Sequence, residues 1–254
     1  MKLDQTRIEA LLPGIAVEVL QEVDSTNSEA KRRLKAGLRH PLLLAAEHQT
    51  AGRGRQGKSF YSPDGTGIYM TLTVHPHAPL TDAVSVTTRA SVAVCRAIRQ
   101  ETGLQPEIKW VNDLYLYGKK ICGILVEAES DFAAGITKSL VIGVGVNVTT
   151  AEFPTELTEA ASLAVEADRD RLIAAIAREL LREMTDLRDG SYLEDYRRWS
   201  MVIGREIVWL RNGETREAKA IAIDEAGGLV IEEADGTRLT LSSGEISLRL
   251  RSAE

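Results

Sequence analysis

The sequence predicts an α+β protein: a sheet packed with helices, followed by a small β-barrel. Up to about Gly204, short apolar runs rich in β-branched residues alternate with segments whose apolar residues recur at helical spacing. After Gly204, four or five short apolar segments are separated by glycine turns, a pattern typical of a small barrel. The 254 residues, 44% of them hydrophobic, are enough to bury a core. We therefore expect two domains, residues 1–202 and 203–254.

The first half of the chain has a helix start signal and two strands around a glycine-rich loop. Thr26-Asn27-Ser28-Glu29 has the S/T-x-x-E pattern of a capping box, which predicts a helix that begins at Ser25 or Thr26 and ends at Gly37. Apolar runs predict strands over 42–49 and 67–74, with a loop over 52–57 between them. Helical spacing of apolar residues predicts a long helix over 80–101, packed on the sheet and ended by Gly103.

The following segment contains short strands and then two helices. Strands are expected at 107–110, 114–116 and 121–126, the last two joined by a turn around Tyr117-Gly118-Lys119. Residues 140–148 form a buried strand in which Gly143 and Gly145 leave room for another group to approach closely. Amphipathic patterns predict helices over 168–187 and 192–199.

Charge and composition argue against several classes of protein. A net charge of −6 offers no general attraction for a polyanion, so we expect no nucleic-acid partner. Neither a signal peptide nor an apolar stretch long enough to cross a membrane is present. Cys95 and Cys122 lie in apolar runs, which indicates buried thiols in a reducing cytoplasm. His75 and His77 have no companion ligand nearby, so we expect no metal held by the protein itself.

The glycine loop 52–59 satisfies both G-x-G-x-x-G and the P-loop pattern G-x-x-x-x-G-K-[ST]. Both motifs need a helix that begins at the loop, yet Pro63 and further glycines follow within a turn. A P-loop NTPase is therefore disfavoured. Arg53, Arg55 and Lys58 still gather three cations on a flexible backbone, which favours binding of an anion such as a nucleotide α-phosphate. A solvated turn with no ligand stays open.

A second group of polar residues covers 109–127. Lys120 lies at the edge of an apolar strand, where a long cationic side chain can be directed into a pocket. The plainer interpretations are a hairpin tip for Lys119-Lys120 and a turn for Asn112-Asp113.

Together these segments resemble the biotin protein ligases, or biotin–acetyl-CoA-carboxylase ligases, over nearly the whole chain. The matching motifs, in chain order, are DSTN at 24–27, QTAGRGRQGK at 49–58, KWVNDLYL at 109–116, KICGILVE at 120–127, GVGVN at 143–147 and GEISLR at 244–249. The resemblance implies a mixed sheet flanked by helices, akin to class II aminoacyl-tRNA synthetases, and an SH3-like barrel after it. It is closest to the short, monofunctional type, because the chain before Asp24 is too short for the N-terminal DNA-binding domain that some members carry.

The resemblance also implies roles for individual residues. Lys120, Arg53 and Asp113 match the catalytic positions, with Lys120 bridging the biotin carboxylate and the α-phosphate. The biotin contacts would be Ser25, Thr26, Asn27, Gln49, Gly52, Arg53, Lys120 and Gly123. The nucleotide contacts would be Arg55, Lys58, Phe60, Asn112, Asn147 and Arg249, with Glu245 bracing the interface between domains. Val111 stands where the family commonly has Pro.

The implied reaction joins biotin to ATP, with Mg²⁺, to give biotinyl-5'-AMP, and then transfers biotin to a lysine of a biotin carboxyl carrier protein. Asp113 would orient the carrier amine or accept its proton. A lipoate or octanoate ligase or transferase on the same scaffold is the nearest alternative; a non-catalytic DNA-binding regulator is a more distant one. The sequence leaves open the identity of the carrier and the choice between monomer and homodimer.

Overall fold

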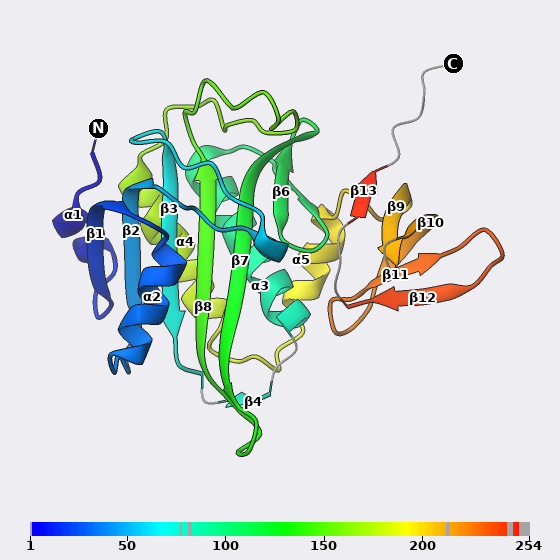
Figure 1. Cartoon of the computed structure of the whole chain (residues 1–254), viewed down its shortest axis with the longest axis horizontal. Helices are drawn as coiled ribbons and strands as arrows, with labels where there is room; N and C mark the ends of the chain where they lie inside the picture. The colour runs from blue at the N-terminus through cyan, green and yellow to red at the C-terminus, as the bar shows by residue number, and fades with distance from the viewer. Residues whose placement is uncertain (1, 77, 81–82, 212–213, 243–245, 249–254) are drawn as a thin grey trace.

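A large mixed sheet forms the centre of the molecule, and a smaller antiparallel sheet packs beside it (Figure 1). The computed structural model describes residues 2–76, 78–80, 83–211, 214–242 and 246–248. The elements up to the middle of the chain are α1 (Gln5–Leu11), β1 (Ala16–Val23), α2 (Thr26–Lys35), β2 (Leu42–Gln49), the 3₁₀ turn η1 (Arg55–Gly57), β3 (Gly67–Val74), β4 (Ala78–Pro79) and α3 (Ala83–Thr102). They are followed by β5 (Glu107–Lys109), β6 (Asp113–Leu116), β7 (Lys119–Asp131), β8 (Ile136–Asn147), α4 (Arg169–Glu183) and α5 (Tyr192–Trp199).

The large sheet has the strand order β1-β2-β3-β8-β7-β6-β5, with β4 paired to the outer end of β8. Strands β1 and β2 are parallel and the other neighbours are antiparallel. The expected mixed sheet flanked by helices is therefore confirmed. None of the helices that the structure describes is long and apolar enough to span a membrane.

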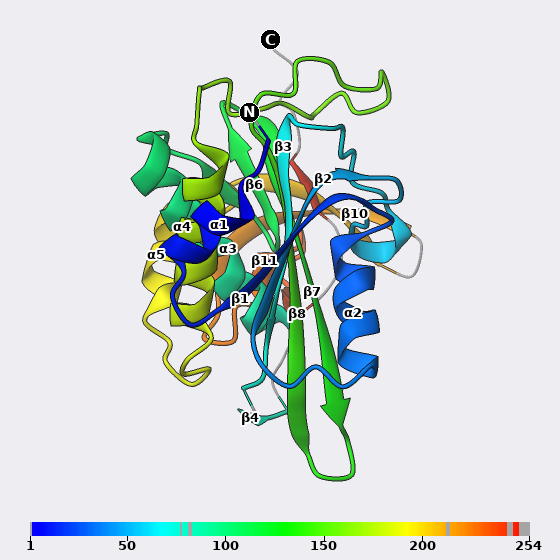
Figure 2. The same ribbon diagram turned by 90° about the vertical axis from the view of Figure 1, so that its left-hand side faces the viewer.

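Helices cover the two faces of this sheet unequally (Figure 2). Alternate residues of β2 pack on opposite faces of the sheet, because successive side chains of a strand point to opposite sides. Leu42 and Leu44 pack with Ala30 and Leu34 of α2. Leu43 and Ala45 instead join the main core, to which α1, α3, α4 and α5 all contribute. One face thus carries a thick helical layer. Among the α-helices in the described part of the chain, only α2 covers the other face, which leaves part of that face open for a site.

Most predicted elements are confirmed, with β2 and β3 at their expected bounds. The turn between β6 and β7 has positive φ at both Tyr117 and Gly118, as in a type I′ hairpin. Helix α1 and strand β1 were not predicted, because charged residues interrupt their apolar patterns. Cys95 and Cys122 are buried free thiols as expected, and burial raises the pKa of both, that of Cys95 to about 11.

The predicted capping box does not form, although helix α2 begins where expected. Ser25 is the N-cap, yet its side chain makes no capping hydrogen bond. Glu29 pairs instead with Arg32 and Arg33 on the next turn of the helix. Side chains at the start of α2 are directed toward the open face of the sheet, where tertiary contacts replace the local ones.

Strand β7 contains a bulge that changes the direction of one important side chain. Opposite β6, Asp113 pairs with Gly123 and Leu114 with Cys122, but Tyr115 pairs with Lys120 rather than Ile121. Ile121 and Cys122 therefore both enter the main core. Because a bulge shifts the alternation by one residue, Lys120 emerges on the open face together with Gly123.

The second sheet has the strand order β12-β11-β10-β9-β13 and is antiparallel throughout. Its strands are β9 (Glu206–Arg211), β10 (Glu214–Ile223), β11 (Leu229–Glu232), β12 (Arg238–Leu241) and β13 (Ile246–Leu248). In the part of the chain that is described, no pairing joins β12 to β13, so closure into an SH3-like barrel stays a prediction. The sheet is fixed to the large one through Trp110, whose Nε1 donates to Gly227 O at 3.0 Å.

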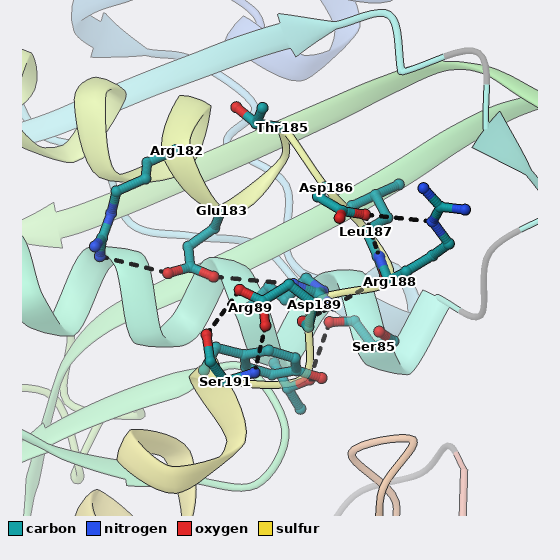
Figure 3. A network of polar contacts seen from close by, with 12 residues as sticks. Ser85, Arg89, Arg182, Glu183, Thr185, Asp186, Leu187, Arg188, Asp189 and Ser191 are labelled. Atoms are coloured by element: carbon teal, nitrogen blue, oxygen red, sulfur yellow. Dashed lines mark hydrogen bonds and ion pairs between the residues drawn. The ribbon is translucent and has the colours of Figure 1, made fainter.

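A buried arginine holds the connection between α4 and α5 (Figure 3). Arg89 of α3 is 3% exposed and donates through Nη2 to the carbonyl oxygens of Leu187, at 2.8 Å, and Asp189. Its guanidinium also lies 4.3 Å from the centre of the Tyr192 ring, and Glu183 approaches it to 3.9 Å. This cluster fixes the helical layer on the face opposite the open one.

Candidate functional site

A cavity of about 430 Å³ lies on the open face of the large sheet. Its walls come from the start of α2, the glycine loop, the turn before β6, strands β7 and β8, and the segment 156–160 after β8. It contains most of the predicted site residues: Ser25, Thr26, Asn27, Gln49, Arg53, Arg55, Lys58, Phe60, Asn112, Asp113, Lys120 and Gly123. Segments far apart in the sequence therefore meet at one cavity.

The floor of the cavity depends on glycines that face it from neighbouring strands. A Cβ atom on Gly143 would lie 2.1 Å from Oδ1 of Asn27, and one on Gly145 would lie 2.5 Å from the Phe60 ring. Gly145 pairs with Gly123, where a Cβ would lie 3.3 Å from the same ring. The room predicted at Gly143 and Gly145 is thus filled by two of the chain's own cavity residues.

Buried polar side chains at the start of α2 form one end of the cavity. Gln49 accepts from Thr26 through Oε1, at 2.8 Å from the backbone N and 3.2 Å from Oγ1, and donates to Ser62. Thr71 of β3, which is fully buried, donates to Thr26 Oγ1 at 2.8 Å and to Asn27 Oδ1 at 2.6 Å. Ser25, Thr26 and Asn27 are all less than 5% exposed. This end offers fixed donors and acceptors to a polar, uncharged group.

The glycine loop folds back on itself instead of starting a long helix. Phe60 N donates to Gly52 O at 2.9 Å, and a Cβ atom on Gly52 would lie 2.4 Å from Phe60 O. The tip is a single 3₁₀ turn in which Gln56 has φ 53°, and the chain then runs extended toward β3. A P-loop needs an α-helix at this point, so the structure agrees with setting that motif aside.

The two arginines of the loop bind different partners. Arg53 donates through Nη1 and Nη2 to both carboxylate oxygens of Glu127, at 2.9 and 3.0 Å. Arg55 donates through Nη1 to Asn112 Oδ1 at 3.0 Å. Both guanidinium groups therefore lie at the cavity with their orientation fixed by a hydrogen-bonded partner.

Lys120 and Asp113 form an ion pair inside the cavity, with Nζ 2.7 Å from Oδ2. Asn112 donates through Nδ2 to the other Asp113 oxygen at 3.0 Å and to Ile124 O at 2.9 Å. Val111, which precedes them, is buried, and its carbonyl oxygen accepts from Ser91 and Tyr196. The chain around Asn112 and Asp113 is thus held from both sides.

The segment 156–160 closes one side of the cavity by pairing with Lys120. Lys120 N donates to Glu159 O at 2.7 Å, and Ala161 N donates to Lys120 O at 2.8 Å. Tyr115 donates its hydroxyl to Glu159 Oε2 at 2.8 Å, and Lys109 donates to the same hydroxyl at 3.1 Å. Burial, followed by the nearby Glu159 carboxylate, raises the pKa of Tyr115 well above its ordinary value. Tyr115 is therefore a neutral donor at neutral pH.

Among the predicted site residues that the structure describes, Gly52 and Asn147 do not line the cavity. Gly52, the first residue of the glycine loop, is buried. Asn147 is buried at the end of β8, where Nδ2 donates to Ala161 O at 2.9 Å and so supports the segment that closes the cavity. Arg249, like Glu245, lies outside the described residues. Their neighbour Ile246 of β13 is described and does line the cavity, so the second sheet reaches the site.

The sequence assigned no role to Tyr115 or Glu159, which line the cavity, or to Glu127, which binds the cavity residue Arg53. Glu127 lies four residues beyond Gly123 on β7, so strand alternation alone assigns it to the same face. That signal could have found it as a carboxylate facing the basic loop. Glu159 has no comparable signal, because it reaches the cavity from an irregular segment. In the part of the chain that is described, no group of three or more His, Cys, Asp and Glu side chains is arranged to hold a metal ion.

Comparison with known proteins gives consistent matches along the chain. Residues 19–147 match the biotin/lipoate A/B protein ligase family, and residues 202–249 match the biotin protein ligase C terminal domain. The biotin–acetyl-CoA-carboxylase ligase of Mycobacterium tuberculosis is 30% identical over 241 residues, which cover 91% of this chain and 88% of the relative.

Solved structures agree with these sequence matches. The biotin protein ligase from Aquifex aeolicus in complex with biotin and ATP is 26% identical, with a TM-score of 0.78 over 92% of this chain and 98% of that one. The biotin protein ligase from Leishmania major in complex with biotinyl-5-AMP is also 26% identical, with a TM-score of 0.62 over 90% and 99% of the two chains.

Proposed function

The chain belongs to the biotin/lipoate A/B protein ligase family, and from that membership we propose that it is an ATP-dependent biotin protein ligase. It joins biotin to ATP to form biotinyl-5'-AMP and pyrophosphate, and then transfers biotin to a lysine of a biotin carboxyl carrier protein, releasing AMP. The observation that carries the proposal is one cavity with buried neutral polar groups at one end and several cationic side chains around the rest.

The polar end suits the ureido ring of biotin, which both donates and accepts hydrogen bonds. Ser25, Thr26, Asn27 and Gln49 supply groups of both kinds and are largely buried. The hydrogen bond between Thr26 and Gln49, and that from Thr71 to Asn27, fix the positions of these side chains before a ligand arrives. Gly52 and Gly123 let backbone and ring groups approach closely at this side of the cavity. Such preorganised polar groups favour a ligand that can satisfy them over one that cannot.

The cationic part suits the joining of two anions. Biotin brings a carboxylate and ATP brings its phosphates, and two like unit charges 4 Å apart repel by about 4 kcal/mol at an effective dielectric constant of 20. Lys120, Arg53 and Arg55 offset this repulsion and stabilise the charge that develops at the α-phosphorus. The biotin carboxylate oxygen attacks the α-phosphorus, and pyrophosphate leaves. We assign the nucleotide side to Arg55, Lys58, Phe60, Asn112, Asn147 and Arg249.

We assign Asp113 to the second step. The attacking lysine amine of the carrier must lose a proton as it forms the amide with biotin and displaces AMP. Asp113 presents its carboxylate beside Lys120, at the position where we place the mixed anhydride. Asp113 therefore orients the amine or accepts its proton. Mg²⁺ accompanies ATP as a counter-ion of its phosphates.

Residues 203–254 form a second domain in this proposal, with an SH3-like barrel, and residues 1–202 form the catalytic domain. The match of residues 202–249 to a C-terminal domain of biotin protein ligases supports this division. The carrier is that of acetyl-CoA carboxylase or a similar enzyme, as the name of the mycobacterial relative suggests, and the protein acts in the cytoplasm.

Mass spectrometry tests the proposal directly. The protein incubated with biotin and MgATP should yield biotinyl-AMP, and addition of a carrier domain should move the biotinyl mass to one lysine of the carrier. Lipoate or octanoate, supplied in place of biotin, should give neither the corresponding acyl-AMP nor an acylated carrier. Labelling of the carrier by lipoate but not by biotin would instead identify a lipoate ligase.

A further inference from the structure

We propose that Glu127 is a positioning residue of the ligase reaction, which orients the Arg53 guanidinium toward the carboxylate of biotin. The proposal rests on the proposed function, because it takes biotin as the ligand. Glu127 lies on β7, outside the group of residues assigned to substrate, and acts through Arg53 and not by contact with biotin.

The carboxylate of Glu127 joins three elements beside the cavity. Its Oε1 accepts from Lys31 Nζ at 2.8 Å and from Arg53 Nη2 at 3.0 Å. Its Oε2 accepts from Arg53 Nη1 at 2.9 Å and from Asn27 Nδ2 at 3.1 Å. A carboxylate has about four lone-pair positions, so these four bonds use its capacity. One side chain thus ties the glycine loop to helix α2 and to the sheet.

The same geometry leaves Arg53 able to bind a second anion. A guanidinium has five N–H groups in a fixed plane, and Glu127 engages two of them. The remaining groups can donate to a carboxylate in the cavity that Arg53 lines. Because Arg53 is itself 39% exposed and stands on a loop, its side chain would otherwise sample many rotamers. A fixed partner removes that entropy before biotin binds.

Glu127 is ionised at the pH at which the enzyme works. Burial alone raises its pKa, but hydrogen bonds from Lys31, Arg53 and Asn27 outweigh burial, so the pKa lies below its ordinary value. Its charge is more than balanced by Arg53 and Lys31. Removing that charge therefore has two opposite expected effects: a more positive site attracts an anion more strongly, whereas a disordered Arg53 binds it more weakly. The direction in which the Kd of biotin changes therefore distinguishes a purely electrostatic effect from a positioning role.

Calorimetry measures the change in the Kd of biotin. Glu127→Gln keeps the size of the side chain and should raise the Kd of biotin about tenfold, since hydrogen bonds to charged groups are worth that much. The control Glu129→Ala changes an exposed carboxylate two residues further along β7 and should leave the Kd unchanged. With biotinol, which lacks the carboxylate, Glu127→Gln should change the Kd by less than about twofold, because Arg53 then has no anion to bind.

A double-mutant cycle tests whether Glu127 acts through Arg53. Arg53→Ala should weaken biotin binding at least as much as Glu127→Gln, and adding Glu127→Gln to Arg53→Ala should cost almost nothing further. The proposal is overturned if Glu127→Gln leaves biotin affinity unchanged or tightens it. It is equally overturned if the effect of Glu127→Gln persists in full without Arg53.

Trypsin cleavage provides a measurement that needs no ligand. If Glu127 holds the loop, Glu127→Ala should speed cleavage after Arg55 and Lys58, and Glu129→Ala should not. Equal cleavage rates in Glu127→Ala and the wild type would overturn the proposal. A wild-type protein that binds no biotin would instead refute the proposed function. The cleavage rates would still show whether Glu127 restrains the glycine loop.

Discussion

Lys120 shows how one residue's position on a strand decides its chemistry. By plain alternation it would point, with Cys122, into the main core, where a charged amine would be costly. The β7 bulge turns it instead into the cavity, where its Nζ lies 2.7 Å from Asp113. A cation fixed at this place can stabilise charge as it develops, which is the most effective use of an electrostatic group in catalysis.

Lys120→Ala should therefore cut the rate of biotinyl-AMP formation about 10²- to 10³-fold, the typical result of removing one preorganised electrostatic group. The melting temperature should change little, because the side chain is one third exposed. Single-turnover assays with mass detection measure the rate. Lys138→Ala, which removes an exposed lysine paired with Asp131, is the control and should react as the wild type does. An unchanged rate in Lys120→Ala would remove this residue from the mechanism.

Asp24, just before α2, gives a pH-dependent prediction. A hydrogen bond from Arg32 lowers its pKa from 3.8 to about 2. Because the folded-state pKa is the lower one, Asp24 stabilises the fold above pH 4 and loses this contribution as the pH falls toward 2. The pair is about half exposed, so the contribution is below about 1 kcal/mol.

Thermal unfolding between pH 6 and pH 2 should therefore show a slightly steeper loss of Tm in the wild type than in Asp24→Asn. Parallel curves for the two proteins would mean that the ion pair between Asp24 and Arg32 contributes nothing in solution.

At the scale of elements, the site depends on the close approach of α2 to β8. Asn27 occupies the space that a side chain at position 143 would need. Its amide accepts a hydrogen bond from Thr71 of β3 and donates one to Glu127 of β7. The side chains of the first residues of α2 therefore make contacts with the sheet and do not cap the helix. This is why the prediction of a capping box was wrong.

Gly143→Ala should displace Asn27, because the new Cβ would lie 2.1 Å from its Oδ1. We expect a loss of about 1 to 3 kcal/mol in the free energy of unfolding, as in other overpacked cores, together with weaker binding of biotin. Denaturant unfolding and calorimetry measure the two effects. Gly190→Ala is the matched control, since a Cβ there meets nothing within 4 Å. Equal stability of the two variants would show that α2 can move away from β8 at little cost.

At the scale of the whole molecule, the two sheets share one hydrophobic core, in which Ile207, Ala220 and Ile231 of the second sheet are fully buried. Trp110 belongs to this core and also lines the cavity, and its Nε1 donates to Gly227 O. Ile246 lines the cavity from the second sheet. The second sheet therefore completes the site physically.

Trp110→Phe should test this connection, because it keeps an aromatic ring but leaves the buried carbonyl of Gly227 without its donor. An unsatisfied buried acceptor costs about 1 to 3 kcal/mol, so the free energy of unfolding should fall by that amount in denaturant titrations. If the free energy of unfolding is unchanged, the hydrogen bond from Trp110 to Gly227 makes no net contribution to stability.

Arg249→Ala tests the proposed role of the C-terminal end in nucleotide binding. The family resemblance places this residue near ATP, so the variant should raise the KM for ATP while biotin affinity and Tm stay close to those of the wild type. Steady-state kinetics with varied ATP provides the measurement. A wild-type KM for ATP would remove Arg249 from the nucleotide site.

The sequence by itself determined the strands β2 and β3, the helices α2 to α5 and the residues of the main motifs. These features depend on local properties: the period of apolar residues, the φ preferences of glycine and the order of short motifs along the chain. Only the tertiary structure decided that Lys120 points into the cavity, that Glu127 binds Arg53 and that Asn27 fills the space above Gly143. Each of these depends on contacts between segments distant in sequence. A bulge or an ion pair of this kind gains its free energy only once the partner strands and helices are in place, so the local pattern of residues carries little trace of it.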